Sequence, residues 1–319
     1  MNLEGKVITL LVPTFNEIEA VENFFSKIID PISEIKRKYG LSTEFLFVDN
    51  ASTDNTIFSI YENCKKRDYS FKIIRWIRNY GVMTSIYGGL KFISKKNGAT
   101  IIFDFDLQDP PELIVQLVDS WVAGSVLVTG LRIKRAENFK IALGRRIFRL
   151  IYKLLGQRNE AMVESGVWLL DEKIIQDLMS NPPSTTYLAG VLQNRNYSRT
   201  VIPYERLKRT AGKSNFSFIK YLRYGFEGLI SVPFKFMRLV FLTGSALVAS
   251  TIGLLFFVLF RKYFLDVSPT DGVTLIFAVL VTLFSFVILL LGILGEYISR
   301  IFENTGRIEE TVVDQILED

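Results

Sequence analysis

The chain has 319 residues, 49% of them hydrophobic, and a formal net charge of +5. It contains no histidine, which excludes every mechanism or metal site that needs an imidazole, such as a Ser-His-Asp triad or a His-ligated zinc ion. Its single cysteine, Cys64, excludes an intrachain disulfide and fits a reducing compartment.

Alternating strands and helices are predicted in the N-terminal third of the chain. Apolar runs predict buried strands at 6–13, 43–49, 71–77 and 99–106. Helices are predicted between them, from Ile18 to Tyr39, after the segment 51–56 with Ser52 or Thr53 as the cap, and from Ser85 to Lys95. This alternation predicts an α/β fold with a mostly parallel sheet that helices cover on both faces.

Polar residues follow each of these predicted strands. They are Asn16 and Glu17, Asp49 and Asn50, Arg78 and Asn79, and Asp104 and Asp106. Ligands of parallel sheets bind beyond the carboxyl ends of the strands, so we expect these side chains to share one site. The chain has neither G-x-G-x-x-G nor a Walker lysine motif, which argues against a dinucleotide dehydrogenase and a P-loop kinase.

The segment IIFDFDLQDPPE, residues 101–112, carries three acids directly after an apolar run. In an extended strand Asp104 and Asp106 point to the same side, and two adjacent carboxylates repel each other unless a cation lies between them. Oxygen ligands suit Mg²⁺ or Mn²⁺. The alternative is an acidic turn without a metal, in which Asp109 caps a helix that begins near Pro110 and Pro111.

Two stretches without charge, 239–260 and 273–295, are each long enough to cross a bilayer. They predict a transmembrane hairpin, and the alternative is a pair of buried helices in a soluble domain. Basic residues flank the pair, which favours an orientation with both ends inside. The N-terminal residues do not resemble a signal peptide. We therefore expect a multi-pass protein of the plasma (inner) membrane whose N-terminal domain is cytoplasmic.

Two basic amphipathic stretches precede the first of these apolar segments. In 138–155 apolar residues at helical spacing alternate with arginines and lysines, and a second such stretch covers 216–239. They predict contact with a membrane interface, and the alternative for the first is an ordinary surface helix. A lipid surface and phosphate groups are then better partners for the positive charge than nucleic acid.

Four motifs occur in a characteristic order: VPTFNE (12–17), VDNASTD (48–54), RNYG (78–81) and DFDLQDPPE (104–112). Together they resemble the inverting glycosyltransferases of family 2, in particular the polyprenyl-phosphate branch. That branch includes dolichol-phosphate mannose synthases, bactoprenol glucosyltransferases and aminoarabinose transferases. The segments YERLKRTAGKSNFS (204–217) and GILGEYISRIFE (292–303) are similar to the later motifs of the same branch.

The resemblance implies a nucleotide-diphosphate-sugar transferase domain of the GT-A type, a two-helix transmembrane anchor and Mg²⁺ or Mn²⁺ as cofactor. It implies transfer of a hexose from a nucleotide sugar, such as a UDP-sugar, to polyprenyl (undecaprenyl) phosphate at the cytoplasmic leaflet. The expected domains are a catalytic domain at 1–205 with an amphipathic helix at about 138–156, an interface segment at 206–236, the hairpin at 237–300 and a cytoplasmic tail at 301–319.

The resemblance also assigns residue roles. The metal ligands would be Asp104, Asp106 and Gln108, and the catalytic residues Asp106 and Glu164. The nucleotide sugar would contact Pro13, Asn16, Glu17, Asp49, Arg78 and Asp104. The acceptor and its phosphate would contact Arg132, Arg145, Arg146, Arg209 and Ser214. Glu164 is a candidate base or acceptor-site acid, and the alternative for it is a solvated loop carboxylate.

The chain departs from the family pattern at several positions. Asn50 replaces the second acid of an Asp-Asp pair, Ala51 replaces a glycine, Asn215 replaces a lysine, and the segment around Gly166 lacks the usual aspartate. Two other functions therefore stay open: transfer to a different lipid or glycan acceptor, and a non-catalytic membrane module that binds nucleotide sugars. Homo-oligomerisation is also left open.

Overall fold

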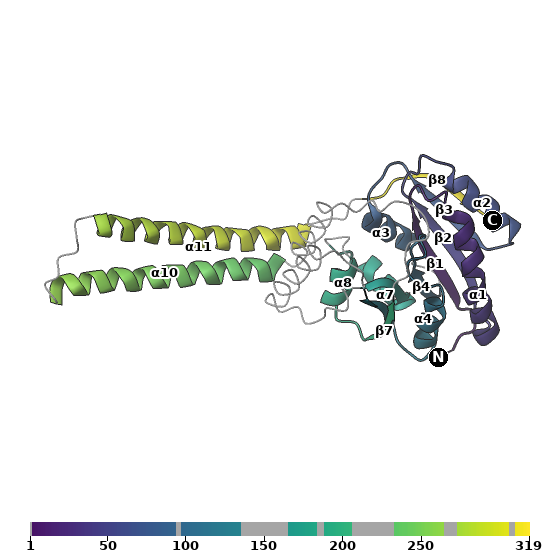
Figure 1. The fold of residues 1–319 in the computed structure, drawn as a ribbon, viewed down its shortest axis with the longest axis horizontal. Helices are drawn as coiled ribbons and strands as arrows, with labels where there is room; N and C mark the ends of the chain where they lie inside the picture. Colours follow the sequence, from purple (N-terminus) through teal and green to yellow (C-terminus); the bar gives the residue numbers. More distant parts are fainter. Residues whose placement is uncertain are drawn as a thin grey trace. The chain divides into compact units, whose positions relative to one another are not determined.

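The computed structural model describes residues 2–93, 97–134, 165–183, 188–205, 233–264, 273–305 and 310–319 (Figure 1). The chain divides into two compact units. The sheet unit consists of residues 1–145, 159–221 and 307–319, and the hairpin unit of residues 146–158 and 222–306. The sheet unit is therefore built from segments on both sides of the hairpin.

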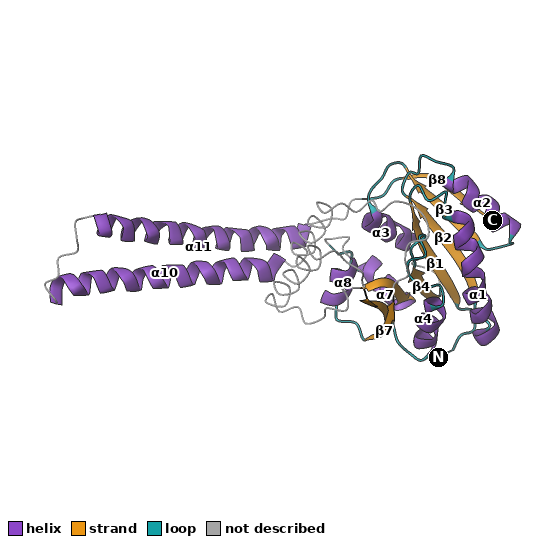
Figure 2. Cartoon of the chain, in the orientation of Figure 1, coloured by secondary structure: helices purple, strands orange, loops and turns teal. Residues whose placement is uncertain are grey.

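The described part of the sheet unit forms one sheet of eight strands in the order β7-β5-β6-β4-β1-β2-β3-β8. Strands are orange and helices purple in Figure 2. Strands β1 to β4 are mutually parallel, whereas β6 and β8 run antiparallel to their neighbours. The strands are β1 (Val7–Thr14), β2 (Ser42–Asp49), β3 (Phe71–Trp76), β4 (Gly98–Ile102), β5 (Leu127–Lys134), β6 (Ser165–Asp171), β7 (Arg199–Glu205) and β8 (Val313–Glu318).

Helices cover both faces of this sheet. Two apolar cores result, because alternate strand residues point to opposite faces. Phe45 and Phe47 of β2 belong to one core, and Leu46 and Val48 to the other. The first core also contains residues of α1 (Val21–Tyr39), α2 (Thr56–Lys66) and α4 (Leu113–Val122). The second contains residues of α3 (Val82–Ile93), α7 (Glu172–Ser180) and α8 (Leu188–Asn194).

The predicted α/β fold with a mostly parallel sheet is confirmed, but two details of the prediction are wrong, and the alternative role of Asp109 as a helix cap is not found. Strand β4 ends at Ile102, and the chain turns at 105–106 instead of continuing as a strand. Helix α2 has Asn55 at its N-cap, without a side-chain cap bond, in place of Ser52 or Thr53. Helix α4 has Glu112 at its N-cap, so Asp109 is not the cap residue. The hydroxyl of Ser52 and the carboxylate of Asp109 bond elsewhere, as described below.

The segment expected to be a tail, 301–319, contributes a strand to the sheet unit. Strand β8 pairs antiparallel with β3, with Lys72 opposite Glu318 and Trp76 opposite Val313. Gly88 of α3 allows the residues before β8 to approach, because a Cβ there would lie 2.5 Å from Oγ1 of Thr311. These contacts make residues 311–319 part of the folded sheet unit.

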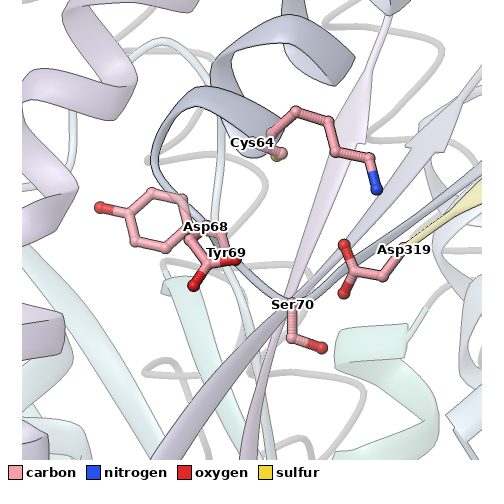
Figure 3. Close-up of a pocket in the computed structure, with 6 residues that line it drawn as sticks. Cys64, Asp68, Tyr69, Ser70 and Asp319 are labelled. Carbon is pink, nitrogen blue, oxygen red and sulfur yellow. The ribbon is translucent and has the colours of Figure 1, made fainter.

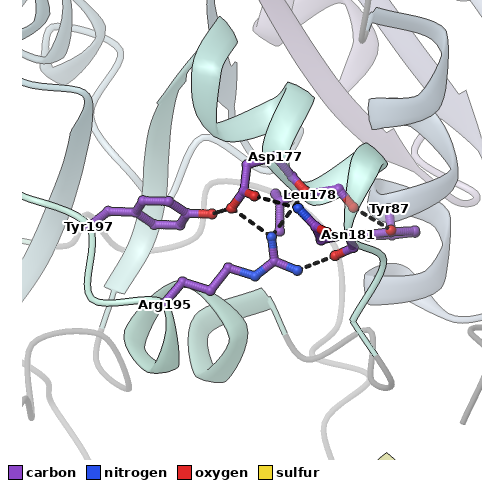
Figure 4. A network of polar contacts seen from close by, with 6 residues as sticks. All are labelled: Tyr87, Asp177, Leu178, Asn181, Arg195 and Tyr197. Atoms are coloured by element: carbon purple, nitrogen blue, oxygen red, sulfur yellow. Dashed lines mark hydrogen bonds and ion pairs between the residues drawn. The ribbon is translucent and has the colours of Figure 1, made fainter. Parts of the chain in front are cut away.

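A polar network secures the end of α7 (Figure 4). The carboxylate of Asp177 accepts hydrogen bonds from Arg195 at 2.7 Å, from Asn181 at 2.9 Å and from the hydroxyl of Tyr197. These bonds, first of all the one from Tyr197, lower the pKa of Asp177 to about 2. The hydroxyl of Tyr87 in α3 donates to the carbonyl of Leu178 at 3.1 Å. The network joins α7, α3 and the segment that leads into β7.

The hairpin unit contains two long helices, α10 (Pro233–Phe264) and α11 (Val273–Thr305), which lie side by side (Figure 1). They approach closely at Gly244, where a Cβ would lie 3.0 Å from the Cα of Leu289. Over the residues that the structure describes, no helix combines the length and the apolarity needed to cross a membrane. The two predicted helices are therefore found, whereas their prediction as membrane spans is not confirmed.

Candidate active site

The candidate site lies at the carboxyl edge of the parallel strands, where four turns meet; we call this edge the rim. The turn after β1 is tied to the turn after β2. The backbone N–H of Asn16 donates to Oγ of Ser52 at 2.9 Å, and Oδ1 of Asn16 accepts from the N–H of Thr53 at 2.8 Å. Asn16 adopts a φ of 53°, a conformation that asparagine tolerates better than most residues. These bonds explain why an asparagine stands at this position.

The turn after β2 is built around the buried carboxylate of Asp49. This carboxylate accepts hydrogen bonds from the backbone N–H of Ser52, at 3.0 Å, and from its hydroxyl. Burial raises the pKa of Asp49, and the two bonds from Ser52 oppose that rise. Ala51 takes a φ of 62°, which a glycine would adopt at lower cost. Asp49 therefore shapes the turn from inside rather than presenting a solvated charge.

Asn50 connects this turn to the turn after β3. Its Nδ2 donates to Oδ1 of Asn79 at 3.0 Å, and its Oδ1 accepts from the N–H of Tyr80 at 2.8 Å. Oδ1 of Asn79 also accepts from the N–H of Gly81 at 2.9 Å. An aspartate at position 50 could not donate to Asn79. The departure from the family acid thus has a structural reason in this chain.

Asp104 and Asp106 follow β4 at the same rim. Phe103 and Phe105 are buried in the same core as Ile101, whereas Asp104 and Asp106 are partly exposed. The apolar and acidic side chains therefore alternate in burial as the sequence predicted, although the strand has ended. The next residue, Leu107, has a φ of 51°, and the N–H of Gln108 donates to Asp106 at 3.1 Å. A left-handed non-glycine residue inside this turn indicates backbone strain there.

The oxygen atoms in the turn after β4, which we call the acid turn, suit a hard cation. Within the described ranges, no group of three or more His, Cys, Asp or Glu side chains is placed to hold a metal ion. A magnesium ion, however, is commonly held by one or two carboxylates together with the phosphates of its substrate. Asp104, Asp106 and the side-chain oxygen of Gln108 match that chemistry. The residues present therefore fit Mg²⁺ or Mn²⁺ bound together with a diphosphate.

Asp109 anchors the acid turn to the neighbouring strands. Arg132 of β5 donates to Asp109 from Nε at 3.1 Å and from Nη2 at 2.7 Å, and the hydroxyl of Tyr204 in β7 donates to it at 2.6 Å. Burial alone would lower the pKa of Arg132, but the charge of Asp109 and its hydrogen bonds raise it. A Cβ at Gly166 would overlap the guanidinium, so position 166 must be glycine while Arg132 keeps this place.

Arg132 was expected to face phosphates, and its guanidinium is here paired with Asp109. Asp104 adds a further attraction, so Arg132 lies close enough to sense the charge of the acid turn. Its role toward phosphate stays a prediction.

The other residues predicted to contact the nucleotide sugar are placed as follows. Arg78 lies on the rim with its guanidinium over the ring of Tyr80 at 4.3 Å, and Pro13 lies in β1 opposite Val48. Glu17 donates its N–H to Thr56 at 2.9 Å.

Five predicted site residues lie outside the described residues: Glu164, Arg145, Arg146, Arg209 and Ser214. The structure brings the predicted donor residues and both predicted metal acids to the one rim. Sequence reasoning placed Asn79 at the rim but assigned it no partner, and it missed Tyr204, which bonds to Asp109. No local signal indicates Tyr204, because it lies 95 positions from Asp109 in the chain.

A pocket of about 330 Å³ lies away from this rim (Figure 3). Ser70, which precedes β3, lines it, so the pocket lies at the opposite end of that strand from the RNYG turn. Its other lining residues are Cys64, Lys65, Asp68, Tyr69 and Asp319. Burial raises the pKa of Cys64 to about 12, so its thiol is protonated at neutral pH. The pocket is therefore not part of the candidate site.

Comparison with known proteins agrees with this geometry. Residues 9–179, more than half of the chain, match the model of glycosyl transferase family 2. The chain is 28% identical over 300 residues to the uncharacterized glycosyltransferase YkcC of Bacillus subtilis (strain 168), covering 92% of this chain and 89% of that protein. It is 28% identical over 299 residues to the bactoprenol glucosyl transferase of Shigella phage SfV, covering 92% and 94%.

A solved structure shares the fold of the chain. The crystal structure of a mycobacterial protein aligns with a TM-score of 0.50 and 17% identity, covering 72% of this chain and 75% of that one. An identity this low bears on the fold alone. Together with the family match, it agrees with an α/β fold of the nucleotide-sugar transferase type.

Proposed function

Because the chain belongs to glycosyl transferase family 2, we propose that it transfers a hexose from a nucleotide sugar, such as a UDP-sugar, to a polyprenyl phosphate. The observation that carries the proposal is the convergence of four polar turns on one rim. The turn after β1 lies between the turn shaped by Asp49, after β2, and the turn of Asp104 and Asp106, after β4. The likeness over almost the whole chain to proteins named bactoprenol glucosyl transferase supports the choice of acceptor.

The rim residues divide the work of holding the donor. The turn formed by Asp49 and Ser52 would receive the base and ribose, and Arg78 would lie near the sugar or its phosphates. Asp104, Asp106 and Gln108 would hold Mg²⁺ or Mn²⁺, which supplies a positive charge for the departing nucleoside diphosphate. The turn after β4 is fixed by Asp109 and Arg132, so these oxygens are oriented before the donor arrives.

The acceptor supplies its own nucleophile. An oxygen of the lipid phosphate forms the bond to the anomeric carbon while the bond from that carbon to the diphosphate breaks, which inverts the configuration. A phosphate is already ionised at neutral pH, so a strong base is less necessary than for a sugar hydroxyl. Glu164 would position the acceptor or take a proton. Arg145, Arg146, Arg209 and Ser214 would bind its phosphate by charge-assisted hydrogen bonds.

We propose further that α10 and α11 anchor the protein in the plasma membrane, with the catalytic domain in the cytoplasm. The support is the absence of charge from 239–260 and 273–295 and the exposure of large apolar side chains along both helices, among them Phe256, Phe284 and Leu291. Extraction of isolated membranes with alkaline carbonate tests this. The chain should stay in the membrane pellet, and its release into the supernatant would exclude an integral anchor.

The first experiment on the activity uses the purified chain in detergent with Mg²⁺ or Mn²⁺, undecaprenyl phosphate and a panel of nucleotide sugars. Nucleoside diphosphate release and the mass of the lipid product are followed together. A lipid carrying one hexose identifies the donor and supports the proposal. Diphosphate release with a glycan or a different lipid, and none with undecaprenyl phosphate, would assign another acceptor. Binding of nucleotide sugars without transfer to any acceptor would indicate a non-catalytic module.

The acceptor residues can be separated from the donor residues by a charge-matched pair of variants. Replacing Arg145 and Arg146 with Ala should raise the KM for undecaprenyl phosphate and leave the KM for the nucleotide sugar unchanged. Replacing Lys65 and Lys66 at the end of α2 removes the same charge away from the rim and serves as the control. Equal effects of the two double variants would show that only the net charge matters.

A further inference from the structure

The segment 310–319 touches the rim at the turn after β3. The N–H of Ile77 donates to the carbonyl of Val312 at 3.0 Å, and the N–H of Val312 donates to the hydroxyl of Tyr80 at 3.3 Å. Tyr80 is the residue whose N–H bonds to Asn50 and whose ring lies under Arg78. The turn after β3 is therefore held on one side by the turn after β2, which we call the donor turn because it would receive the nucleotide sugar, and on the other side by the C-terminal segment.

A second link runs through Arg75 of β3. Its Nη2 donates to the carbonyl of Ser52 at 3.2 Å, and its Nε lies 3.4 Å from Oδ2 of Asp314. The same guanidinium attracts the carboxylate of Asp49 and so opposes the rise in the pKa of Asp49 that burial causes. Arg75 thus lies between the turn that shapes the candidate donor site and an acid of β8.

The ion pair between Arg75 and Asp314 bears on the orientation of the Arg75 guanidinium. The Nε atom of Arg75 is buried and makes no hydrogen bond within the described residues, and the carboxylate of Asp314 forms an ion pair with it. The two side chains keep 35% and 50% of their surface exposed, and exposed ion pairs of this kind add little to stability. Their effect is instead to select one orientation of the guanidinium.

We propose that the start of strand β8 is part of the donor site and that its Asp314 is a positioning residue for that site. Asp314 orients Arg75, and Arg75 fixes the carbonyl of Ser52 and thereby the turn that receives the base and ribose of the nucleotide sugar. The inference rests on the proposed function, because it takes a nucleoside diphosphate sugar as the ligand of this turn. It adds a donor-site role for a strand that follows the hairpin in the chain.

The test compares two acids of β8 in the full-length protein. Asp314→Asn removes the charge beside Arg75, and Glu318→Gln removes a charge from the same strand at its other end, where Glu318 pairs with Lys72 at 2.7 Å. Asp314→Asn should raise the KM for the nucleotide sugar and the Kd for UDP by about two- to fivefold, with kcat and the KM for the lipid phosphate unchanged. Glu318→Gln should change none of these.

A double-mutant cycle shows whether the effect passes through Arg75. Arg75→Lys keeps the charge but cannot reach both Ser52 and Asp314, so it should raise the donor KM as well. Asp314→Asn in the Arg75→Lys background should then add little. Equal effects of Asp314→Asn and Glu318→Gln, or additive effects in the cycle, would overturn the inference while leaving the transferase activity in place. A wild-type chain that binds no nucleotide would overturn both.

Discussion

The turn after β2 and the turn after β4 lie at the same rim but are held by different chemistry. The first is held by the buried carboxylate of Asp49, which accepts from Ser52, and by neutral amide bonds of Asn50 and Asn79. The second is held by the buried ion pair of Asp109 and Arg132. A neutral hydrogen bond contributes about 1 kcal/mol, whereas removing one partner of a buried ion pair costs about 3–5 kcal/mol.

The two turns differ in whether the groups that hold the backbone are also the groups that would bind the ligand. In the donor turn, the groups that hold the backbone are the same groups that would meet the nucleotide. In the acid turn, Asp109 holds the backbone while Asp104 and Asp106 remain partly exposed for a ligand. Substitutions in the donor turn should therefore alter stability and binding together, whereas those in the acid turn should alter one without the other.

The largest expected effect on stability comes from breaking the ion pair. Asp109→Asn leaves the guanidinium of Arg132 buried without its countercharge and should lower the free energy of unfolding by about 3–5 kcal/mol. Urea unfolding followed by tryptophan fluorescence measures it. Asp119→Asn is the matched control, since its pair with Lys38 is exposed and its loss should cost much less. Similar losses in the two variants would contradict the contrast drawn between buried and exposed pairs.

A second variant sharpens the distinction within the acid turn. Asp106→Asn should reduce sugar transfer by at least about a hundredfold, because a ligand of the cation and its charge are lost together. Its thermal unfolding should match that of the wild type. The measurement is lipid product formed over a range of Mg²⁺ and Mn²⁺ concentrations. Full activity in Asp106→Asn would remove this residue from the metal site, whatever the cofactor.

An intermediate effect is expected in the donor turn. Asn50→Asp removes the donor to Asn79 and sets a carboxylate against its Oδ1, so stability should fall by about 1–3 kcal/mol and the donor KM should rise. Asn55→Asp makes the same chemical change at the N-cap of α2, where a negative charge is favourable, and should be neutral or slightly stabilising. If Asn50→Asp kept both stability and donor KM, the coupling between the turns after β2 and β3 would be unimportant.

The smallest effect concerns the network at Asp177, which is remote from both turns. Its pKa is about 2, below the 3.8 of an ordinary aspartate, so its ion pair and hydrogen bonds stabilise the protein above about pH 4. That contribution is lost as the pH falls from 4 toward 2. Asp177→Asn should therefore flatten the stability profile in this interval, by a small amount because the carboxylate is exposed. Thermal unfolding at pH 2–5 shows it, and parallel profiles would exclude the contribution.

The sequence predicted the parts of the fold that local patterns encode. Apolar runs located β1 to β4, and the polar residues after them located the rim. The predicted end of β4 is wrong, because the strand stops at Ile102. Beyond it, buried Phe103 and Phe105 still alternate with partly exposed Asp104 and Asp106, so the sequence pattern continues where the strand does not. Ser52 and Thr53 match the pattern of helix caps, and nothing in the local sequence shows that both instead bond to Asn16 in the turn after β1.

Partners distant in the chain account for the rest. Asp109 pairs with residues of β5 and β7, and no local pattern connects these positions. Strand β8 is short, largely exposed and follows two long helices, so its pairing with β3 depends on a sheet edge that the local sequence does not identify. The residues 135–164 and 206–232, which hold most of the predicted acceptor groups, lie outside the described residues.

The placement of β8 has a consequence for how the protein is made. Strand β3 is complete once residue 76 has been synthesised, but its outer edge stays unpaired until residues 313–318 follow. Both long helices of the hairpin are translated in that interval. An unpaired strand edge can pair with other chains, so the nascent sheet is exposed to that risk until β8 has been made. The protein therefore completes its sheet last, after the helices that precede β8 have left the ribosome.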